Sequence, residues 1–499
     1  MRQVSAASGA ERHDGFSAVR TFGFPDDNPE ASLLLPPPPL VRFGAPHSRL
    51  YIRGHRALRC PRCVVRGCSL KRVAVVGSGI TGLAAAYRLA RDARVTLFEA
   101  GNWFGGHTHT VDVTLDGHTH GVDTGFLVFN HRTYPNLVRL FDELRVDTCA
   151  SDMSFSVQVH EAGLEWSGNN LNTVFAQRRN LLRPRFLRML ADIGRFNELT
   201  TAIAERGAES DLAQPIGDFL GQHRFDTAFR EWYFLPMIGC IWSCPTDQML
   251  RFPISTMIRF CHNHGLIQVT NRPQWYTVTG GAKHYVAKLL KGIADARLNT
   301  PVRSVRRGPG GVTVGTDAGN ERFDDVVLAC HSDQSLTLLA DASDAERAML
   351  GAVRYHPNRA VLHTDAAVLP RRKLAWAAWN YARAADTGRE QAAVCLHYLI
   401  NRLQPLPWQQ PVVVSLNPDP AHPPAPQKVL QSFEYSHPVF DGAAIAAQQQ
   451  LPALQGRGGV WFGGAWTRYG FHEDGLMSAL DIVERVRHSW QATPEAIAA

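Results

Sequence analysis

A strand-like apolar run that leads into a glycine-rich turn, near residue 73, constrains the fold of this chain more than any other feature. Residues 73–76 read Val-Ala-Val-Val, which is typical of a strand buried on both faces of a sheet. Gly-Ser-Gly-Ile-Thr-Gly follows at residues 77–82, and residues 83–90 are mostly good helix formers. A strand, a tight turn and a helix in this order predict an α/β fold with a Rossmann-like domain.

The turn has the glycine spacing of a dinucleotide-binding site. Gly77 permits a tight turn, Gly79 lets backbone amides approach a pyrophosphate, and Gly82 permits close helix packing. Residues 95–98 predict a second strand, and Glu99 at its end can accept hydrogen bonds from ribose hydroxyls. We therefore expect the nucleotide to contact Gly77, Ser78, Gly79, Ile80, Thr81, Gly82, Glu99 and Ala100.

A Gly-Gly pair, Gly105 and Gly106, follows the second predicted strand. Here the chain resembles the flavin-containing amine oxidase superfamily, which includes phytoene desaturases and protoporphyrinogen oxidases. The resemblance implies FAD as the cofactor, with the Gly-Gly pair beside its pyrophosphate and ribityl group. His107 stands where the family commonly has an arginine. The resemblance also implies that residues 121–129, with Gly125 and Phe126, pass beside the isoalloxazine ring.

A second glycine turn lies near the C-terminus, at residues 458–466, and apolar residues follow at helical spacing from Gly475. The resemblance implies that this turn and helix bring backbone amides to the flavin, where the helix dipole would stabilise the reduced form. Gly464 stands near the place where the family often has an acid. The flavin contacts expected from this part of the chain are Gly464, Ala465, Gly475, Leu476 and Ser478.

Three strands are expected between these ends, at residues 296–305, 312–314 and 323–329. By resemblance, the first contacts adenine through the backbone of Val302. The FAD-binding domain would then be discontinuous, formed by residues 72–130, 277–340 and 456–495. Residues 131–276 and 341–455 would form a second, α+β substrate domain, with helices over 177–250 and strands over 351–416. Its many aromatic residues fit either an apolar substrate tunnel or ordinary core packing.

Within the superfamily, the chain is most similar to a bacterial group of predicted NAD/FAD-binding proteins. Phrases such as Trp-Tyr-Thr-Val-Thr-Gly-Gly at residues 275–281 and Tyr-Gly-Phe-His-Glu-Asp-Gly at residues 469–475 carry this similarity. Members of the group are often encoded beside cyclopropane-fatty-acyl synthase-like methyltransferases. The resemblance therefore implies a lipid acyl chain as substrate and such a methyltransferase as a partner.

These features predict an FAD-dependent oxidoreductase that oxidises or desaturates an apolar substrate. No second Gly-x-Gly-x-x-Gly is present for NADPH, which favours oxidation over NADPH-driven reduction. His472 and Glu473 follow the second glycine turn and are the candidate catalytic residues, although a structural role for each is equally compatible with the sequence. Two alternatives remain: an amine oxidase acting on a small amine, and a non-catalytic flavoprotein that supports a lipid methyltransferase.

The positive charge of the chain is confined to its N-terminal extension. Residues 1–72 contain 12 Lys or Arg and 5 Asp or Glu, and the rest of the chain, with 40 of each sign, is neutral. This distribution argues against nucleic acid as a partner. Residues 1–71 lack periodicity and are expected to be a disordered extension. A further hypothesis is that much of this extension does not belong to the native protein.

The cysteines predict neither a metal site nor a disulfide framework. Cys60, Cys63 and Cys68 lack the second ligand pair of a structural zinc site, so incidental cysteines are the favoured interpretation. Six others lie scattered through the body, as in a reducing compartment. No apolar run reaches the length of about 18 residues that a membrane-spanning helix requires. A cytoplasmic protein with at most peripheral membrane contact is expected.

Overall fold

Five strands from distant parts of the chain form a parallel sheet in the order β10–β2–β1–β14–β20. β1 (Arg72–Val76) lies between β2 (Arg94–Phe98) and β14 (Asp325–Leu328). β10 (Asp295–Arg297) and β20 (Val460–Phe462) form the two edges. Val73 and Val75 belong to one apolar core, whereas Ala74 and Val76 belong to another. The apolar run at residues 73–76 is therefore the central strand, buried on both faces.

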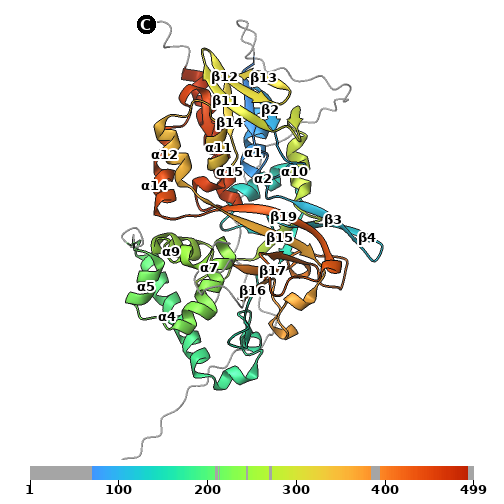
Figure 1. Cartoon of the computed structure of the whole chain (residues 1–499), viewed down its shortest axis with the longest axis vertical. Coiled ribbons are helices and arrows are strands. Elements are labelled where there is room, and N and C mark those ends of the chain that lie inside the picture. Colours follow the sequence, from blue (N-terminus) through green and yellow to red (C-terminus); the bar gives the residue numbers. More distant parts are fainter. Residues whose placement is uncertain are drawn as a thin grey trace, which may run out of the picture. The chain divides into compact units, whose positions relative to one another are not determined.

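The computed structural model describes residues 70–207, 212, 214–242, 245–268, 272–383 and 394–492 (Figure 1). All of them belong to the unit formed by residues 68–499. The predicted extension, residues 1–71, lies outside the described residues except for Leu70 and Lys71, and Cys60, Cys63 and Cys68 lie outside them too. The Lys71 carbonyl accepts a hydrogen bond from Arg94 N (2.8 Å), so the bonding of the sheet begins one residue before β1.

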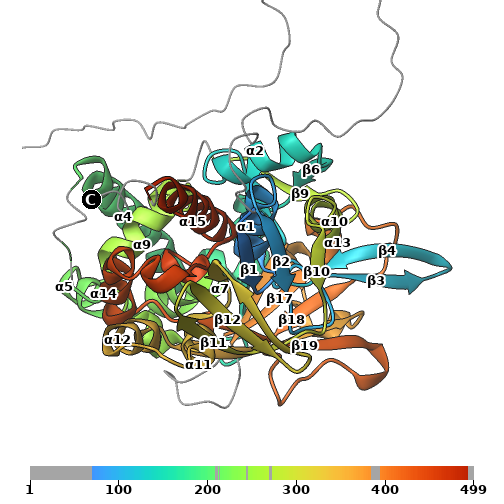
Figure 2. The same cartoon turned by 90° about the horizontal axis from the view of Figure 1, so that it is seen from above.

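Two helices that lie far apart in the sequence pack together beside the parallel sheet. Figure 2 shows α1 (Ile80–Leu89) next to α15 (His472–Ala492). Thr81 Oγ1 donates a hydrogen bond to the carbonyl of Gly475 (2.8 Å) where they meet. A Cβ at Gly475 would lie 2.7 Å from Ile80 Cγ2, so only glycine lets the two helices approach this closely. The region also contains α2 (Pro135–Leu144) and α10 (Lys283–Leu290).

The other apolar core lies between the parallel sheet and a small antiparallel sheet of β11 (Val302–Gly308), β12 (Gly311–Thr316) and β13 (Gly319–Phe323). The strand expected over residues 296–305 is in fact two strands, β10 and β11, which belong to different sheets. The chain turns between them at Asn299, whose φ of 50° lies in the left-handed region, and Pro301 lacks an amide hydrogen for a ladder bond. The helices α11 (Ser332–Leu338), α12 (Asp344–Ala352) and α14 (Gly442–Gln450) flank this core.

A seven-stranded mixed sheet forms the centre of the remaining part, in the order β19–β15–β18–β17–β16–β7–β8. The strand-like alternation at residues 351–416 corresponds to β15, β16, β17 and β18, and the helical patterns at residues 177–250 correspond to α4 to α8. The strands of this sheet are β7 (Phe155–Val159), β8 (Leu164–Ser167), β15 (Tyr355–His363), β16 (Trp379–Arg383), β17 (Cys395–Leu399), β18 (Val413–Leu416) and β19 (Val429–Pro438).

The helices of this part are α3 (Leu171–Val174), α4 (Pro184–Glu205), α5 (Ile216–Gln222), α6 (Thr227–Phe229), α7 (Leu235–Trp242), α8 (Thr246–Met249), α9 (Ile254–Asn263) and α13 (Ile400–Leu403). Short turns of 3₁₀ helix include η1 (Arg178–Leu182), η5 (Lys373–Ala375) and η9 (Ala465–Thr467), and Arg230–Phe234 is a π-helical turn. A hairpin, β3 (Thr110–Leu115) with β4 (His118–Asp123), and a three-stranded sheet of β5 (Phe129–Asn130), β6 (Thr148–Ser151) and β9 (Trp275–Val278) complete the strands.

The α/β fold predicted from the sequence is confirmed, because a parallel sheet is combined with a mixed sheet that carries its own helices. The division into an FAD-binding and a substrate domain at the stated boundaries stays a prediction. Within the described residues, no helix is long and apolar enough to cross a membrane.

Candidate functional site

A cavity of about 830 Å³ opens where β1, β14 and β20 end and extends to β19, α7 and α9. It is lined by fifteen of the nineteen residues expected to contact the cofactor and by His472. Gly82, Gly475, Leu476 and Ser478 do not line it, and neither does Glu473. The predicted site residues from the two ends of the chain are thus brought into one place. Their functional roles stay predictions.

The glycine loop and the start of α1 form one wall of the cavity. Gly77 has a φ of +98° and donates its amide hydrogen to the carbonyl of Phe98 (2.9 Å), which ties the loop to β2. A Cβ at Gly79 would meet no atom within 4 Å, so the loop faces open space there. The first turn of α1 has neither a side-chain cap nor an acidic residue. Its amides are therefore suited to bind an anion in the cavity.

Gly82 acts behind this loop rather than in the cavity. A Cβ at Gly82 would lie only 1.8 Å from the carbonyl oxygen of Gly77, so α1 could not pack against the loop with any other residue there. Ser478 has a comparable role in α15, where its hydroxyl accepts a hydrogen bond from Gly464 N (3.2 Å). These residues shape the cavity wall through backbone packing.

Glu99 holds the loop from the end of β2. Its carboxylate accepts hydrogen bonds from Ser78 N (2.9 Å) and Gly101 N (2.8 Å), and it also accepts one from the Ser78 hydroxyl. Glu99 lines the cavity beside Ala100. The position suits the predicted interaction with ribose hydroxyls.

The Gly-Gly turn lies directly against the glycine loop. A Cβ at Gly106, whose φ is +59°, would lie 3.1 Å from Gly79 Cα, and Gly105 N donates to the Ser78 carbonyl (3.1 Å). The next residue, His107, is half-buried, and its Nε2 atom is buried without a hydrogen-bond partner among the described residues. An unpaired buried nitrogen is costly unless a ligand or water completes it. His107 therefore marks a polar point in the cavity, next to the start of α1.

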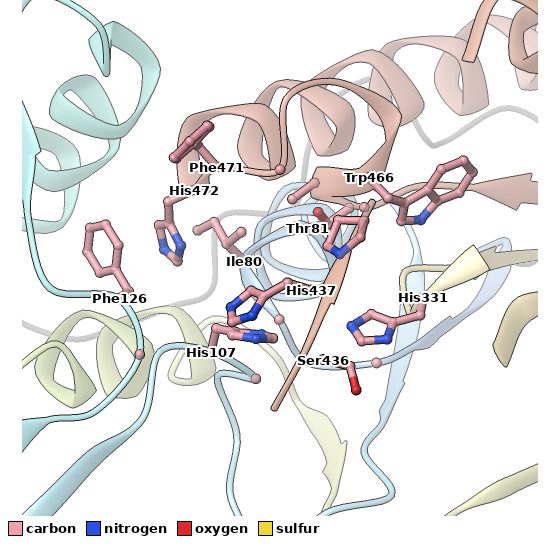
Figure 3. Close-up of a pocket in the computed structure, with 18 of the residues that line it drawn as sticks. Ile80, Thr81, His107, Phe126, His331, Ser436, His437, Trp466, Phe471 and His472 are labelled. Carbon is pink, nitrogen blue, oxygen red and sulfur yellow. The ribbon is translucent and has the colours of Figure 1, made fainter. Parts of the chain in front are cut away.

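Three histidines gather at this point. Figure 3 shows His107 beside His437, with His331 to the right of both rings. The ring centroids of His107 and His437 are 5.2 Å apart, and those of His107 and His331 are 6.5 Å apart. Burial, and then the neighbouring His437, His331 and His472, lower the pKa of His107 well below its ordinary value. Burial lowers the pKa of His437 to about 4. The cluster is therefore uncharged at neutral pH.

Gly125 and Phe126 continue the wall from the Gly-Gly turn. A Cβ at Gly125 would lie 2.2 Å from the His107 carbonyl oxygen, so the two segments touch through backbone atoms. The Phe126 ring stacks on His472 with a centroid distance of 3.9 Å (Figure 3). The predicted flavin segment and the start of α15 thus meet in the cavity.

His472 belongs to a short chain of buried hydrogen bonds. Its Nε2 atom lies 2.6 Å from Tyr285 Oη, which in turn lies 2.5 Å from Thr108 Oγ1. Burial lowers the pKa of His472 to about 3 and raises that of Tyr285. At neutral pH His472 is therefore an uncharged ring whose orientation is set by Tyr285.

Glu473 points elsewhere, although it is the next residue. Its carboxylate accepts hydrogen bonds from Asn136 N (2.9 Å), Asn136 Nδ2 (2.7 Å) and Leu137 N (3.0 Å). These groups belong to the first turn of α2, so both carboxylate oxygens of Glu473 cap that helix. The structure does not bring Glu473 to the cavity together with His472.

Val302 lines the opposite end of the cavity with Thr300, Pro301 and Arg303. Gly464, whose φ is +155°, and Ala465 line it between β20 and α15. Their contacts with adenine and with the flavin stay predictions.

The other half of the cavity is apolar, and sequence reasoning identified only a few of its members. Leu127 and Val128 belong to the segment expected beside the isoalloxazine, and Phe260 and Trp275 are among the aromatic residues that fit a substrate tunnel or core packing. The others come from separate parts of the chain, and no short pattern distinguishes them from ordinary core residues. The residues of this half are Leu127, Val128, Tyr134, Met153, Phe155, Met237, Cys240, Ile241, Phe260, His264, Leu266, Trp275, Trp379, Tyr398 and Phe471.

Several known proteins are similar to this chain in sequence or in fold. A carotenoid phi-ring synthase of Streptomyces griseus is 31% identical over 290 residues, which covers 54% of this chain and 54% of that protein. The chain thus spans about half the length of this curated relative. Among solved structures, a CLA-producing fatty acid isomerase from P. acnes has a TM-score of 0.60 at 16% identity and covers 83% of this chain and 98% of its own. Cyclohexylamine oxidase from Brevibacterium oxydans IH-35A has a TM-score of 0.57 at 16% identity and covers 84% and 100%. The family model for flavin containing amine oxidoreductase matches residues 80–373, which is more than half of the chain, and the chain therefore belongs to that family.

Proposed function

We propose that the chain binds FAD in this cavity and oxidises or desaturates an apolar substrate such as a lipid acyl chain. Three observations support the fit of the cofactor: the open space at Gly79, the uncapped start of α1 and the unpaired Nε2 atom of His107. The amides of α1 and the His107 ring would hold the pyrophosphate, and Glu99 would bind the ribose. When bound, FAD supplies a two-electron acceptor.

The observation that carries the substrate class is the lack of charge in the apolar half of the cavity. Among the described lining residues, the only acids are Glu99, beside the glycine loop, and Asp333, in the first turn of α11. The histidine of the apolar half, His264, has its pKa lowered to about 4 by burial and is therefore neutral. A cationic amine would lose its hydration there without gaining a counter-ion. A hydrocarbon chain has no charge whose hydration would be lost on entering the cavity.

The fold by itself does not choose between substrates, because a fatty acid isomerase and a cyclohexylamine oxidase both share it. The choice rests on the lining residues of this chain. The similarity to proteins encoded beside cyclopropane-fatty-acyl synthase-like methyltransferases also favours an acyl chain, and such a methyltransferase stays the proposed partner.

His472 is the proposed catalytic residue of the pair named from the sequence. It lies at the start of α15, lines the cavity and stacks on Phe126. With Tyr285 at Nε2, its Nδ1 atom is free to orient a substrate or flavin group by a hydrogen bond. The ring stays neutral, so its role would be to position groups rather than to carry charge. For Glu473 we propose the capping of α2.

Anaerobic reduction of the flavin tests this proposal. Purified protein would be saturated with FAD, deoxygenated and mixed with free fatty acids, phospholipids or amines while the flavin absorbance is followed. Bleaching by an acyl lipid, together with loss of two hydrogens from its mass, is the expected result. Bleaching by amines alone would support the amine oxidase alternative. No bleaching by any lipid or amine would support a non-catalytic flavoprotein.

A further inference from the structure

Exposed leucines are concentrated on one surface of the part of the chain that the structure describes. Among the described residues, seven large apolar side chains are exposed, and five of them lie on α3, η1, the start of α4 and η5. Leu182 and Leu171 are 88% and 74% exposed, more than any of the others. The five are Leu171, Leu181, Leu182, Leu187 and Leu374, and we call this region the leucine–arginine surface.

The leucines are neighbours in space as well as in sequence. α3, η1 and the first turns of α4 follow one another within residues 171–188, and η5 packs against α3 and β8. In Figure 1, the segment that runs into α4 lies at the lower end of the view, away from the parallel sheet at the upper end. Leucines exposed on one contiguous surface are unusual for a protein that meets only water.

The same surface carries a high density of positive charge. No acid occurs between Glu165 and Asp192, whereas five arginines do. The three residues directly before Leu374, at the start of η5, add three more cations. The eight are Arg178, Arg179, Arg183, Arg185, Arg188, Arg371, Arg372 and Lys373.

Most of this charge is not neutralised within the described residues. The two acids that flank the segment are buried: Glu165 accepts hydrogen bonds from Arg371 N (3.0 Å) and Arg372 N (3.1 Å), and Asp192 pairs with Arg195 (2.8 Å). Arg188 is the member that has an ion pair, with Asp226 at 3.4 Å.

The arginines are instead held close to one another. Arg183 and Arg185 both lie over the Trp232 ring, 4.7 and 4.8 Å from its centroid. Burial, and then the charges of Arg179 and Arg185, lower the pKa of Arg183. Like charges kept together on a surface form a ready site for an extended anionic partner.

We propose that the leucine–arginine surface docks this protein on an anionic lipid bilayer. The leucines would enter the acyl region, and the cations around them would contact lipid phosphates. Both halves of the surface are needed for this partner: an acidic protein or a nucleic acid would use the arginines and leave the leucines in water. The N-terminal segment, residues 1–72, is positively charged like the leucine–arginine surface, so we do not expect it to bind there.

Vesicle flotation of the full chain tests the proposal. The protein would be mixed with vesicles of phosphatidylcholine alone or of phosphatidylcholine with phosphatidylglycerol. We expect flotation with the anionic vesicles only, and weaker flotation as salt is added. Absence of flotation with anionic vesicles overturns the proposal.

Two double variants test which side chains are responsible. Leu171→Ser with Leu182→Ser should reduce anionic-vesicle binding at least tenfold, since each leucine would otherwise bury several methylene groups. Arg371→Gln with Arg372→Gln should weaken it by about fivefold per cation removed. All four side chains are exposed, so folding should not change.

The matched controls are Leu430→Ser, an exposed leucine on β19, and Arg347→Gln, an exposed arginine on α12. Both controls should bind vesicles like the wild type. Binding that is unaffected by the leucine variant, and that polyglutamate or nucleic acid competes for, overturns the proposal in favour of a polyanionic partner. Vesicle binding is measured without substrate or flavin reduction, so its outcome is independent of the proposed oxidoreductase activity.

Discussion

The substitution Glu473→Gln distinguishes a structural from a catalytic role for the acid beside His472. The carboxylate accepts three hydrogen bonds from the start of α2 and is 6% exposed. A glutamine can offer one oxygen in place of two, so at least one buried donor loses its acceptor, which costs about 1–3 kcal/mol. Removing the negative charge from the N-terminus of α2 costs a further 0.3–2 kcal/mol, roughly. We therefore expect a loss of about 1–5 kcal/mol in the free energy of unfolding.

Urea denaturation followed by circular dichroism measures this loss, with FAD held at one concentration because bound ligand shifts the midpoint. Glu484→Gln, an exposed glutamate on the same helix, is the matched control and should change stability by less than about 0.5 kcal/mol. The rate of anaerobic flavin reduction should stay within about threefold of the wild type once the variant is folded and saturated, which is a change of under 1 kcal/mol. A variant of unchanged stability whose reduction rate falls by a hundredfold would refute the capping argument and restore Glu473 as a catalytic residue.

Three further predictions concern the cavity and its surroundings. Gly79→Val should fold like the wild type but lose FAD, because its side chain enters the open space proposed for the cofactor. Gly82→Ala should lose stability as well as FAD, because its Cβ would collide with the Gly77 carbonyl oxygen. Circular dichroism measures the stability and flavin absorbance the FAD binding, and normal FAD binding by Gly79→Val would contradict the cofactor placement. Tyr285→Phe should slow flavin reduction and alter the pH profile of its rate, because His472 Nε2 loses its hydrogen bond to Tyr285 Oη. The affinity for FAD should change little. An unaltered rate of flavin reduction would argue against a role for His472. Lowering the pH from 7 to 5 should lower the urea midpoint of the FAD-free protein, because groups that are neutral when folded take up protons on unfolding. Burial lowers the pKa to about 3 or 4 in six histidines: His109, His264, His363, His397, His437 and His472. Asp123 opposes this trend, because burial raises its pKa to about 7. A higher urea midpoint at pH 5 than at pH 7 would contradict the balance expected from the histidines.

The position of the glycine loop beside Glu99 could be predicted because its signals are local. The loop at residues 77–82 and Glu99 lie on consecutive elements, so their spacing alone indicates how they meet. His437 shows the opposite case: it reaches His107 through the pairing of β19 with β15 and has no pattern of its own. A contact between residues over 300 positions apart depends on tertiary packing, which no local period reveals.

Adjacency in sequence suggested that His472 and Glu473 act together, but the structure turns them in different directions. His472 and Glu473 are neighbours, but successive residues of an α-helix point about 100° apart, so one faces the cavity and the other faces α2. The strand expected over residues 296–305 failed for a different reason. Asn299 and Pro301 are residue types that strands disfavour, and they mark the turn that divides this segment between two sheets. The expectation of one continuous strand gave this signal too little weight.

The pairing of β1 with β14 and of α1 with α15 sets an order of events during synthesis. As the chain leaves the ribosome, β1 can meet β2 at once, but its other neighbour is made about 250 residues later, and the Thr81–Gly475 contact spans 394 residues. The glycine loop is thus among the first parts to emerge, while the wall that faces it is among the last. During this interval the nascent chain would expose an incompletely paired sheet, and such exposed strand edges are commonly bound by chaperones. Premature termination before α15 should accordingly yield protein that never retains a flavin.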